Sequence, residues 1–301
     1  TNTSPIPVTI TFSESVTGFV IGDLTVGNGT AGNFSGSGTA YTADITPSGQ
    51  GAVTVDVAAN VAQDAAGNLN TAATQLSRTY DNTAPTVTIT SAAPTNTNTS
   101  PISVTITFSE SVTGFVIGDI TVGNGTAGNF SGSGTTYTAD ITPSAQGAVT
   151  VDVAANVAQD AAGNNNTAAT QLSRIYDTTA PTAPTVTSAA ASTNITMPEW
   201  TWNPGTGGNG TYRYRLDNND LTSGATETTT ASYTPATGLS DGAHTLYVQE
   251  RDEAGNWSTS GSYAVTIDGT APTVTITSGA SSNTNTSPIP VTITFSESVT
   301  G

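Results

Sequence analysis

Carboxylate and amide side chains recur in this chain at a fixed spacing. The pattern Asp-x-Ala-Gly-Asn occurs three times, at residues 64–68, 160–164 and 252–256. Calcium binds six to eight oxygen ligands and accepts irregular geometry, so clustered carboxylates and amides suit it well. The chemistry that these residues could support is therefore the binding of calcium ions.

The positions of the motifs along the chain indicate where such ions would bind. If each repeat folds as a sandwich of seven strands, the motif follows the sixth strand, and its loop lies at the end where the chain enters the domain. The linker that leads into each domain adds one aspartate at this end of the domain. We therefore expect three junctional groups of calcium ligands: Asp81, Glu110, Asp119 and Asp160 at the first, Asp177, Asp252 and Asn256 at the second, and Asp268 and Glu297 at the third.

A second interpretation of the same motif needs no metal. Asp and Asn side chains accept hydrogen bonds from nearby backbone amides, and Gly adopts positive φ, so Asp-x-Ala-Gly-Asn also predicts a tight turn. The contiguous calcium loop of EF-hands is absent. Residues 217–220 begin like such a loop, but Leu221 and Thr222 stand where it requires a ligand and a glycine.

The other residue types that could do chemistry are too few or wrongly placed. His244 is the only histidine, and the chain has no cysteine, so neither a zinc site nor a catalytic triad is indicated. We expect His244 to be a polar or half-buried strand residue. The glycine-rich stretch at residues 205–210 lacks the Gly-Lys-Ser/Thr ending of a phosphate loop, which predicts a flexible connection. We therefore expect no enzymatic activity.

Aromatic residues offer a possible binding surface. Trp200 and Trp202 share one face of an expected strand, which favours a place in the core over a sugar-stacking platform. Trp257 follows the third Asp-x-Ala-Gly-Asn turn, where it could instead pack on a neighbouring domain.

Composition excludes several classes of partner. The formal net charge is −17, and all five basic residues are arginines. Nucleic acids and anionic membrane surfaces need clustered cations, so neither is an expected partner. No apolar run approaches the roughly 20 residues that a membrane-spanning helix needs, so we expect no membrane insertion. Only 9% of residues are charged, and the surface must therefore consist largely of Thr, Ser, Asn and Gly.

Internal repeats divide the chain. Residues 1–82 match residues 97–178 with seven differences, and residues 1–18 recur unchanged as residues 284–301. The array is thus expected to run in super-repeats of two near-identical units and one divergent unit. The predicted segments are 1–81 (domain 1), 82–177 (domain 2), 178–268 (domain 3) and 269–301 (the C-terminal segment). We expect domain 1 to lack its first strand and the C-terminal segment to carry the first two strands of another repeat.

The elements that position these residues are short strands. Apolar residues alternate with threonines at residues 8–12, 86–90 and 263–267, which is typical of half-buried antiparallel strands. Turn residues separate these runs, and no segment shows a sustained helical period. Units of 91 to 96 residues with this pattern predict all-β, tandem immunoglobulin-like antiparallel sandwiches.

These motifs carry a resemblance. Phe12-Ser-Glu-Ser-Val16, the Asp-Ala-Ala-Gly-Asn loop and the Asp-x-Thr-Ala-Pro linker resemble bacterial Ig-like repeats of large cell-surface proteins and adhesins. Domain 3, with Trp200-Thr-Trp202, is similar to a second subtype of such repeats. The resemblance implies an extracellular structural repeat, either the stalk of a giant bacterial surface adhesin or the shaft of an extracellular filament.

Several partners are compatible with that resemblance. Near-identical repeats present similar strand edges, so self-association along or between arrays is expected. An alternative function is a glycan- or protein-binding adhesion module centred on domain 3, with a host or environmental surface as its ligand.

Overall fold

The computed structural model describes residues 1–300, which form two compact units, one of residues 1–177 and one from residue 178 onward. Apart from two single-turn 3-10 segments, η1 (Ile21–Asp23) and η2 (Ile117–Asp119), every regular element in this part of the chain is a β-strand. The all-β, tandem immunoglobulin-like fold predicted from the alternating pattern is confirmed. None of the described residues forms a helix long and apolar enough to cross a lipid bilayer.

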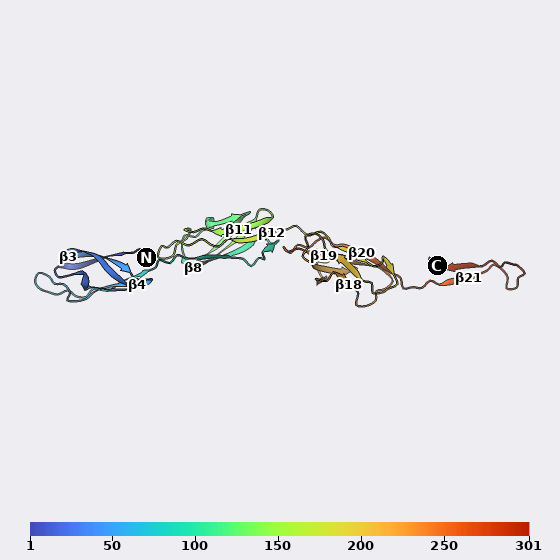
Figure 1. The fold of residues 1–301 in the computed structure, drawn as a ribbon, viewed down its shortest axis with the longest axis horizontal. Coiled ribbons are helices and arrows are strands. Elements are labelled where there is room, and N and C mark those ends of the chain that lie inside the picture. The colour runs from blue at the N-terminus through green and yellow to red at the C-terminus, as the bar shows by residue number, and fades with distance from the viewer. Residues whose placement is uncertain (301) are drawn as a thin grey trace. The chain divides into compact units, whose positions relative to one another are not determined.

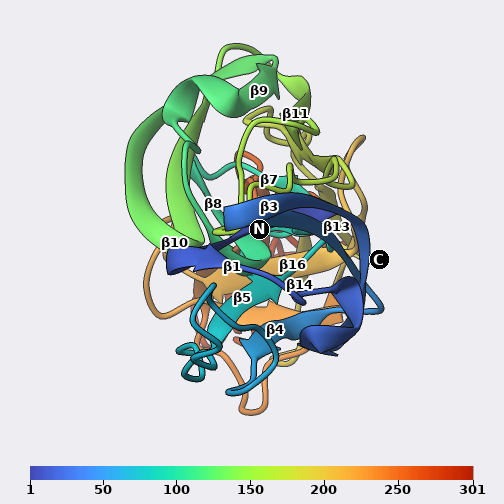
Figure 2. The ribbon, with the colours of Figure 1, turned by 90° about the vertical axis from the view of Figure 1, so that its left-hand side faces the viewer.

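Domain 2 consists of two sheets that enclose one core (Figure 1). One sheet has the order β10-β8-β6 and the other the order β7-β12-β11-β9. Figure 2 shows β9 and β11 together, apart from β8 and β10. The strands are β6 (Val87–Thr90), β7 (Asn96–Thr97), β8 (Ile102–Val112), β9 (Ile120–Gly123), β10 (Gly125–Pro143), β11 (Gly147–Val153) and β12 (Leu172–Tyr176).

Domain 1 repeats this arrangement with a smaller first sheet. Its strands pair in the orders β1-β3 and β2-β4-β5, and β1 corresponds in sequence to β8. Within the described residues, no strand lies along β1 at the place that β6 occupies along β8. The strands are β1 (Ile6–Val16), β2 (Leu24–Gly27), β3 (Gly29–Pro47), β4 (Gly51–Val57) and β5 (Leu76–Tyr80).

Domain 3 is a larger sandwich, with sheets β13-β15-β18 and β14-β20-β19-β16-β17. After it, β21 (Val274–Thr277) and β22 (Thr292–Phe295) form a two-stranded antiparallel ribbon. The strands of domain 3 are β13 (Thr185–Ser188), β14 (Ser192–Thr193), β15 (Trp200–Asn203), β16 (Thr211–Leu216), β17 (Thr226–Thr228), β18 (Ser232–Tyr233), β19 (Gly242–Arg251) and β20 (Gly261–Ile267).

The cores follow from the alternation. In β8 the side chains of Ile102, Val104, Ile106 and Phe108 are buried, and the threonines between them face outward. Aromatic rings close the end of this core, with ring centroids 5.2 Å apart for Phe108 and Phe115. In domain 3 both tryptophans of β15 are buried, which confirms them as core residues.

All five arginines lie in paired strands. Arg78 is in β5 and Arg174 is in β12, while the other three are in β16 and β19. Each is opposite a residue of a neighbouring strand, in the pairs Arg78↔Val53, Arg174↔Val149, Arg213↔Gln249, Arg215↔Tyr247 and Arg251↔Thr211.

Candidate functional site

Three carboxylates meet where the chain enters domain 2. One oxygen from each of Asp81, Glu110 and Asp160 lies within 4.8 Å of the other two. Calcium–oxygen distances are about 2.3–2.6 Å, so two ligands of one ion can be up to about 5 Å apart. The three carboxylates are therefore close enough to one another to bind a single cation. Within residues 1–300, no other set of three Asp, Glu or His side chains lies this close.

Each carboxylate reaches the group from a different element. Glu110 is in β8, Asp81 is in the linker after β5, and Asp160 begins the Asp-x-Ala-Gly-Asn turn. The Asn164 side chain connects two of these elements, because its Nδ2 donates to the backbone oxygen of Asp81 at 3.0 Å and to Asp160 Oδ2 at 2.8 Å. The turn and the linker are therefore held together at the group.

The Asp-x-Ala-Gly-Asn motif forms the tight turn expected of it. Asp160 Oδ1 accepts hydrogen bonds from the backbone amides of Ala162 and Asn164, both at 2.8 Å. Gly163 has φ +93°, a backbone conformation that residues with a side chain rarely adopt. The same Asp-to-Asn bonds recur at Asp64 and at Asp252 in the other two domains.

Burial and like charge act differently on two members of the group. Burial raises the pKa of Glu110, and the nearby charges of Asp160 and Asp81 raise it further. Burial also raises the pKa of Asp160, but hydrogen bonds from Asn164 and neighbouring amides outweigh this effect, and the net pKa is lowered. Of these two carboxylates, Glu110 therefore takes up a proton more readily, and a bound cation would favour its ionised form.

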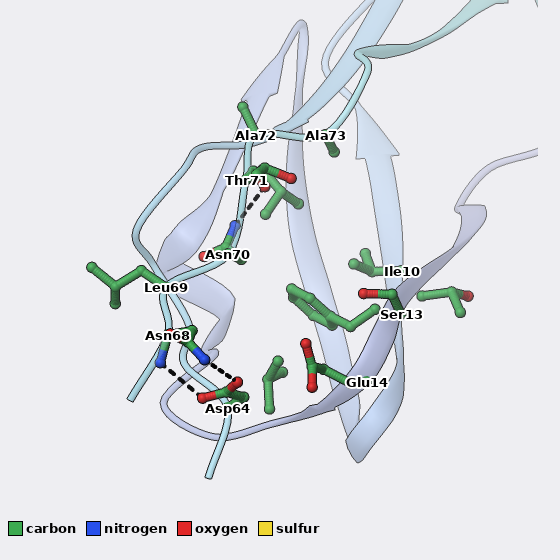
Figure 3. A pocket seen from close by; sticks show the side chains of 14 residues that line it. Ile10, Ser13, Glu14, Asp64, Asn68, Leu69, Asn70, Thr71, Ala72 and Ala73 are labelled. Atoms are coloured by element: carbon green, nitrogen blue, oxygen red, sulfur yellow. Dashed lines mark hydrogen bonds between the residues drawn. The ribbon is translucent and has the colours of Figure 1, made fainter. Parts of the chain in front are cut away.

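Domain 1 contains the counterparts of two members of this group. Figure 3 shows Glu14 and Asp64, the counterparts of Glu110 and Asp160, beside an open pocket. Both are more exposed than their counterparts in domain 2.

The remaining predicted ligands lie elsewhere or stay predictions. Asp119 is not in the three-carboxylate group, because its Oδ2 accepts the backbone amide of Val116 at 2.8 Å and completes the η2 turn. Asp177 ends the first compact unit, whereas Asp252 and Asn256 lie in the second, so calcium at that junction stays a prediction. In the second unit, the Asp268 carboxylate accepts a hydrogen bond from the backbone amide of Thr270 at 3.2 Å. Glu297 is exposed, and calcium binding by Asp268 and Glu297 stays a prediction.

Domain 3 holds a buried carboxylate that sequence reasoning missed. Glu250 in β19 is 0% exposed, and its two oxygens accept the amides of Gly205 at 2.6 Å and Gly210 at 3.1 Å. A Cβ at Gly208 would overlap this carboxyl group. The glycine-rich loop, which we expected to be only a flexible connection, thus wraps around Glu250. Leu246 and Val248 point inward in the same strand, so alternation alone could have placed Glu250 in the interior.

Two other candidates of domain 3 have structural partners. His244 Nδ1 lies 2.7 Å from Asp217 Oδ2, and its Nε2 lies 2.9 Å from the backbone oxygen of Ser240. These two acceptors raise the pKa of His244. The ring of Trp257 is covered by the guanidinium carbons of Arg213 and Arg251, which lie 4.4 and 5.6 Å from its centroid. The Trp257 ring therefore has cation–π partners within its own domain.

Solved structures similar to this chain have low sequence identity with it. Titin domains A168–A170 have a TM-score of 0.39 and 13% identity, covering 78% of this chain and 80% of that one. Fibronectin(III)-like modules of CbhA from Clostridium thermocellum have a TM-score of 0.33 and 16% identity, covering 60% and 93%. Invasin, a bacterial integrin-binding protein, has a TM-score of 0.28 and 11% identity, covering 93% and 60%. No curated protein has a significantly similar sequence.

Family profiles are more specific. Two profiles, both described as a bacterial Ig-like domain, match nearly the whole chain. One matches residues 2–80 and again residues 81–176, and the other matches residues 177–269. The chain belongs to the bacterial Ig-like domain family.

Proposed function

We propose that this chain is a structural spacer of an extracellular bacterial surface protein, forming part of an adhesin stalk or a filament shaft. The observation that carries the proposal is the direct connection between repeats. Only residues 81–86 separate β5 of domain 1 from β6 of domain 2. The linker is itself attached to domain 2, because Thr167 donates its amide to Pro85 O at 2.9 Å and Ser109 donates its amide to Thr86 O at 2.9 Å.

An attached linker favours a mechanical role. A loose linker would let each domain reorient freely, whereas hydrogen bonds at the junction resist this motion and keep the spacing of repeats constant. The spacing, rather than any residue on the surface, would then be the property on which the function depends. No enzymatic role is proposed.

The competing proposal is a binding module in domain 3, and replacement of the array distinguishes the two. In cells that produce the whole protein, the array would be replaced by an unrelated immunoglobulin-like array of equal length. A spacer predicts that surface display and adhesion are retained. Adhesion that is lost although display persists would refute the spacer role and favour the binding module.

We further propose that a calcium ion binds Asp81, Glu110 and Asp160. Three partly or fully buried carboxylates within 4.8 Å of one another repel when ionised, and a divalent cation would relieve this repulsion. Bound there, calcium would fasten the linker to the Asp-x-Ala-Gly-Asn turn of domain 2. Protonation of Glu110 at lower pH would compete with binding.

Hydrogen exchange can test this site within the full chain. Peptides that span residues 156–166 and 60–70 differ at Asn165 and Leu69, so mass spectrometry tells the two repeats apart. Calcium should slow exchange in 156–166, and Glu110→Gln should remove this effect. Glu14→Gln in domain 1 is the matched control and should leave it intact. Equal exchange with calcium and with a chelator in the unmodified chain would refute the site.

A further inference from the structure

Two arginines face outward from the middle of the larger sheet of domain 3. In β19 alternate residues are buried up to Glu250, so Gln249 and Arg251 point away from the core. In β16 the buried Tyr212 likewise leaves Arg213 on the outer face, where it is paired with Gln249. Both strands have a neighbouring strand on each side, so these side chains lie on a closed part of the sheet.

The ring of Trp257 brings the two cations together. Both guanidinium groups lie over this ring, and the Trp257 backbone forms a bridge with Arg251. Nε of Arg213 donates a hydrogen bond to Gln249 Oε1 at 2.7 Å, which fixes the orientation of that guanidinium. All four side chains are half-buried, so they are held in place and are still reached by solvent.

Neither cation has a carboxylate partner. Among residues 1–300, neither Arg213 nor Arg251 forms a salt bridge, and the Nη atoms of both donate no hydrogen bond. Burial lowers the pKa of Arg213, and the charges of Glu227 and Asp220 offset only part of this effect. Two positive charges on one ring also repel each other. A bound anion would reduce both costs.

The other three arginines have acceptors within the chain. Arg78, Arg174 and Arg215 each donate a hydrogen bond from a guanidinium nitrogen to a backbone oxygen, at 2.8 Å in every case. Arg215, the next outward residue of β16 after Arg213, in this way holds the loop before β17. The pair with unused donors is therefore confined to Arg213 and Arg251.

The chemistry of a matching ligand follows from these groups. The two oxygens of a carboxylate match the paired N–H groups of a guanidinium. A peptide cannot add as a strand here, because the backbone groups of β16 and β19 are already paired on both sides. The net charge of −17 repels long polyanions, whereas a ligand with one charge experiences mainly the local field, since salt screens charges beyond about 8 Å.

The neighbouring side chains favour a sugar. On the outer face Thr211 is opposite Arg251, and Tyr247 is two residues from Gln249 in β19. The hydroxyl groups and the Gln249 amide are hydrogen-bonding partners for sugar hydroxyls. The half-buried Tyr247 adds an aromatic ring against which a sugar ring can pack.

We propose that Arg213 and Arg251, held on Trp257, bind the carboxylate of an acidic sugar at the outer face of domain 3. Gln249 and Tyr247 would contact the hydroxyls and the ring of the same sugar. This inference does not rest on the spacer role proposed above, because a repeat that sets a distance can also bind a ligand.

NMR titration of the full chain with a disaccharide that contains one glucuronic acid tests the proposal. The indole N–H signal of Trp257, identified by its loss in Trp257→Phe, should shift saturably, while the signals of the buried Trp200 and Trp202 should stay. The methyl ester of the same disaccharide has no charge and should bind at least about tenfold more weakly. An unmoved Trp257 signal, or equal binding of the ester, would overturn the site.

Substitutions separate recognition from stability. Arg251→Gln should abolish saturable binding, and Arg251→Lys should weaken it about tenfold, because lysine can still stack on Trp257 but lacks the planar fork. Arg78→Gln removes the same charge from domain 1 and is the matched control, with unchanged affinity. Tryptophan emission shows whether domain 3 is folded in each variant, and the lysine variant decides if the glutamine variant unfolds. Full affinity in the folded Arg251 variants, or an equal loss in Arg78→Gln, would refute the assignment.

A tripeptide with a single glutamate distinguishes a sugar from a peptide ligand. It offers the same carboxylate without sugar hydroxyls, so it should bind at least about tenfold more weakly than the disaccharide. A tripeptide that binds as tightly as the disaccharide would overturn the sugar assignment.

Discussion

The buried carboxylate of Glu250 should hold the glycine-rich loop of domain 3, and Glu250→Gln tests this. The side chain accepts two backbone amides and also bonds the Tyr212 hydroxyl, whose pKa is raised by burial, by the Glu250 charge and by that bond. A glutamine of the same size has only one carbonyl oxygen, so its NH₂ group must face one of these donors. Charge-assisted bonds contribute about 1.5–3 kcal/mol each, and we expect domain 3 to lose about 3 kcal/mol.

Tryptophan fluorescence measures this loss in the full chain. All three tryptophans lie in domain 3, so their emission during urea denaturation reports that domain alone. With a slope of about 1.5 kcal/mol per molar urea, the midpoint should fall by about 2 M. Glu227→Gln on exposed β17 is the control and should change the free energy by less than about 0.5 kcal/mol. A Glu250→Gln chain as stable as the unmodified protein would contradict the role of the carboxylate.

A double-mutant cycle tests the contact itself. A Cβ at Gly208 overlaps the Glu250 carboxyl group, so Gly208→Ala should destabilise domain 3. When Glu250 is also replaced by Ala, the space is free and the added cost should largely vanish, giving a coupling of about 1–3 kcal/mol. Strict additivity of the two substitutions would show that the loop does not close on this side chain.

Four further substitutions test other parts of the same structure. Phe108→Ala should cost domain 2 about 3–5 kcal/mol, and Phe12→Ala should cost domain 1 clearly less because its ring is half-buried in this chain. Hydrogen exchange of the two repeats measures both costs, and equal costs would contradict a role of this difference in burial. The pKa of His244 is raised in the folded protein. Its ion pair with Asp217 therefore stabilises domain 3 fully at pH values below about 6.5, the pKa of histidine in the unfolded chain, and this stabilisation is lost as the pH rises through the folded-state pKa. His244→Gln should flatten this pH dependence in fluorescence-detected unfolding, with an effect below about 1 kcal/mol since solvent screens the pair; an unchanged pH profile would refute it. Asn166→Ala should lower the stability of domain 2 by about 3 kcal/mol, because this buried side chain makes four hydrogen bonds to the backbone. Calorimetry of the full chain should show that one unfolding transition moves to a lower temperature. If every transition keeps its temperature, these hydrogen bonds do not contribute to stability.

Strand alternation explains why the fold could be predicted. Once Val104, Ile106 and Phe108 are assigned to one face, the intervening threonines must face outward, and short alternating runs separated by turns leave few architectures. The meeting of Asp81, Glu110 and Asp160 followed from the same topology, since strand ends and connecting loops share one end of a sandwich.

Local hydrogen bonds explain what could not be predicted. The sequence predicted Asp119 at the same end of domain 2. Its carboxylate instead accepts a hydrogen bond from the backbone amide of Val116, and residue type alone does not distinguish this role from metal ligation. For Glu250 the inward position was visible in the alternation. What could not be seen is that a loop about 40 residues earlier supplies the amides that make burial of its charge tolerable.

The placement of every arginine in a paired strand has a consequence for resistance to proteolysis. Proteases that cleave after basic residues need an extended, accessible segment, and lysine is absent from the chain. The bonds after Arg78 and Arg174, for example, lie within hydrogen-bonded ladders. Such an enzyme must wait until a sheet opens, so digestion would proceed at a rate set by unfolding equilibria and not by the exposure of loops. The many loops of this chain can therefore be long and polar without becoming points of attack for trypsin-like enzymes.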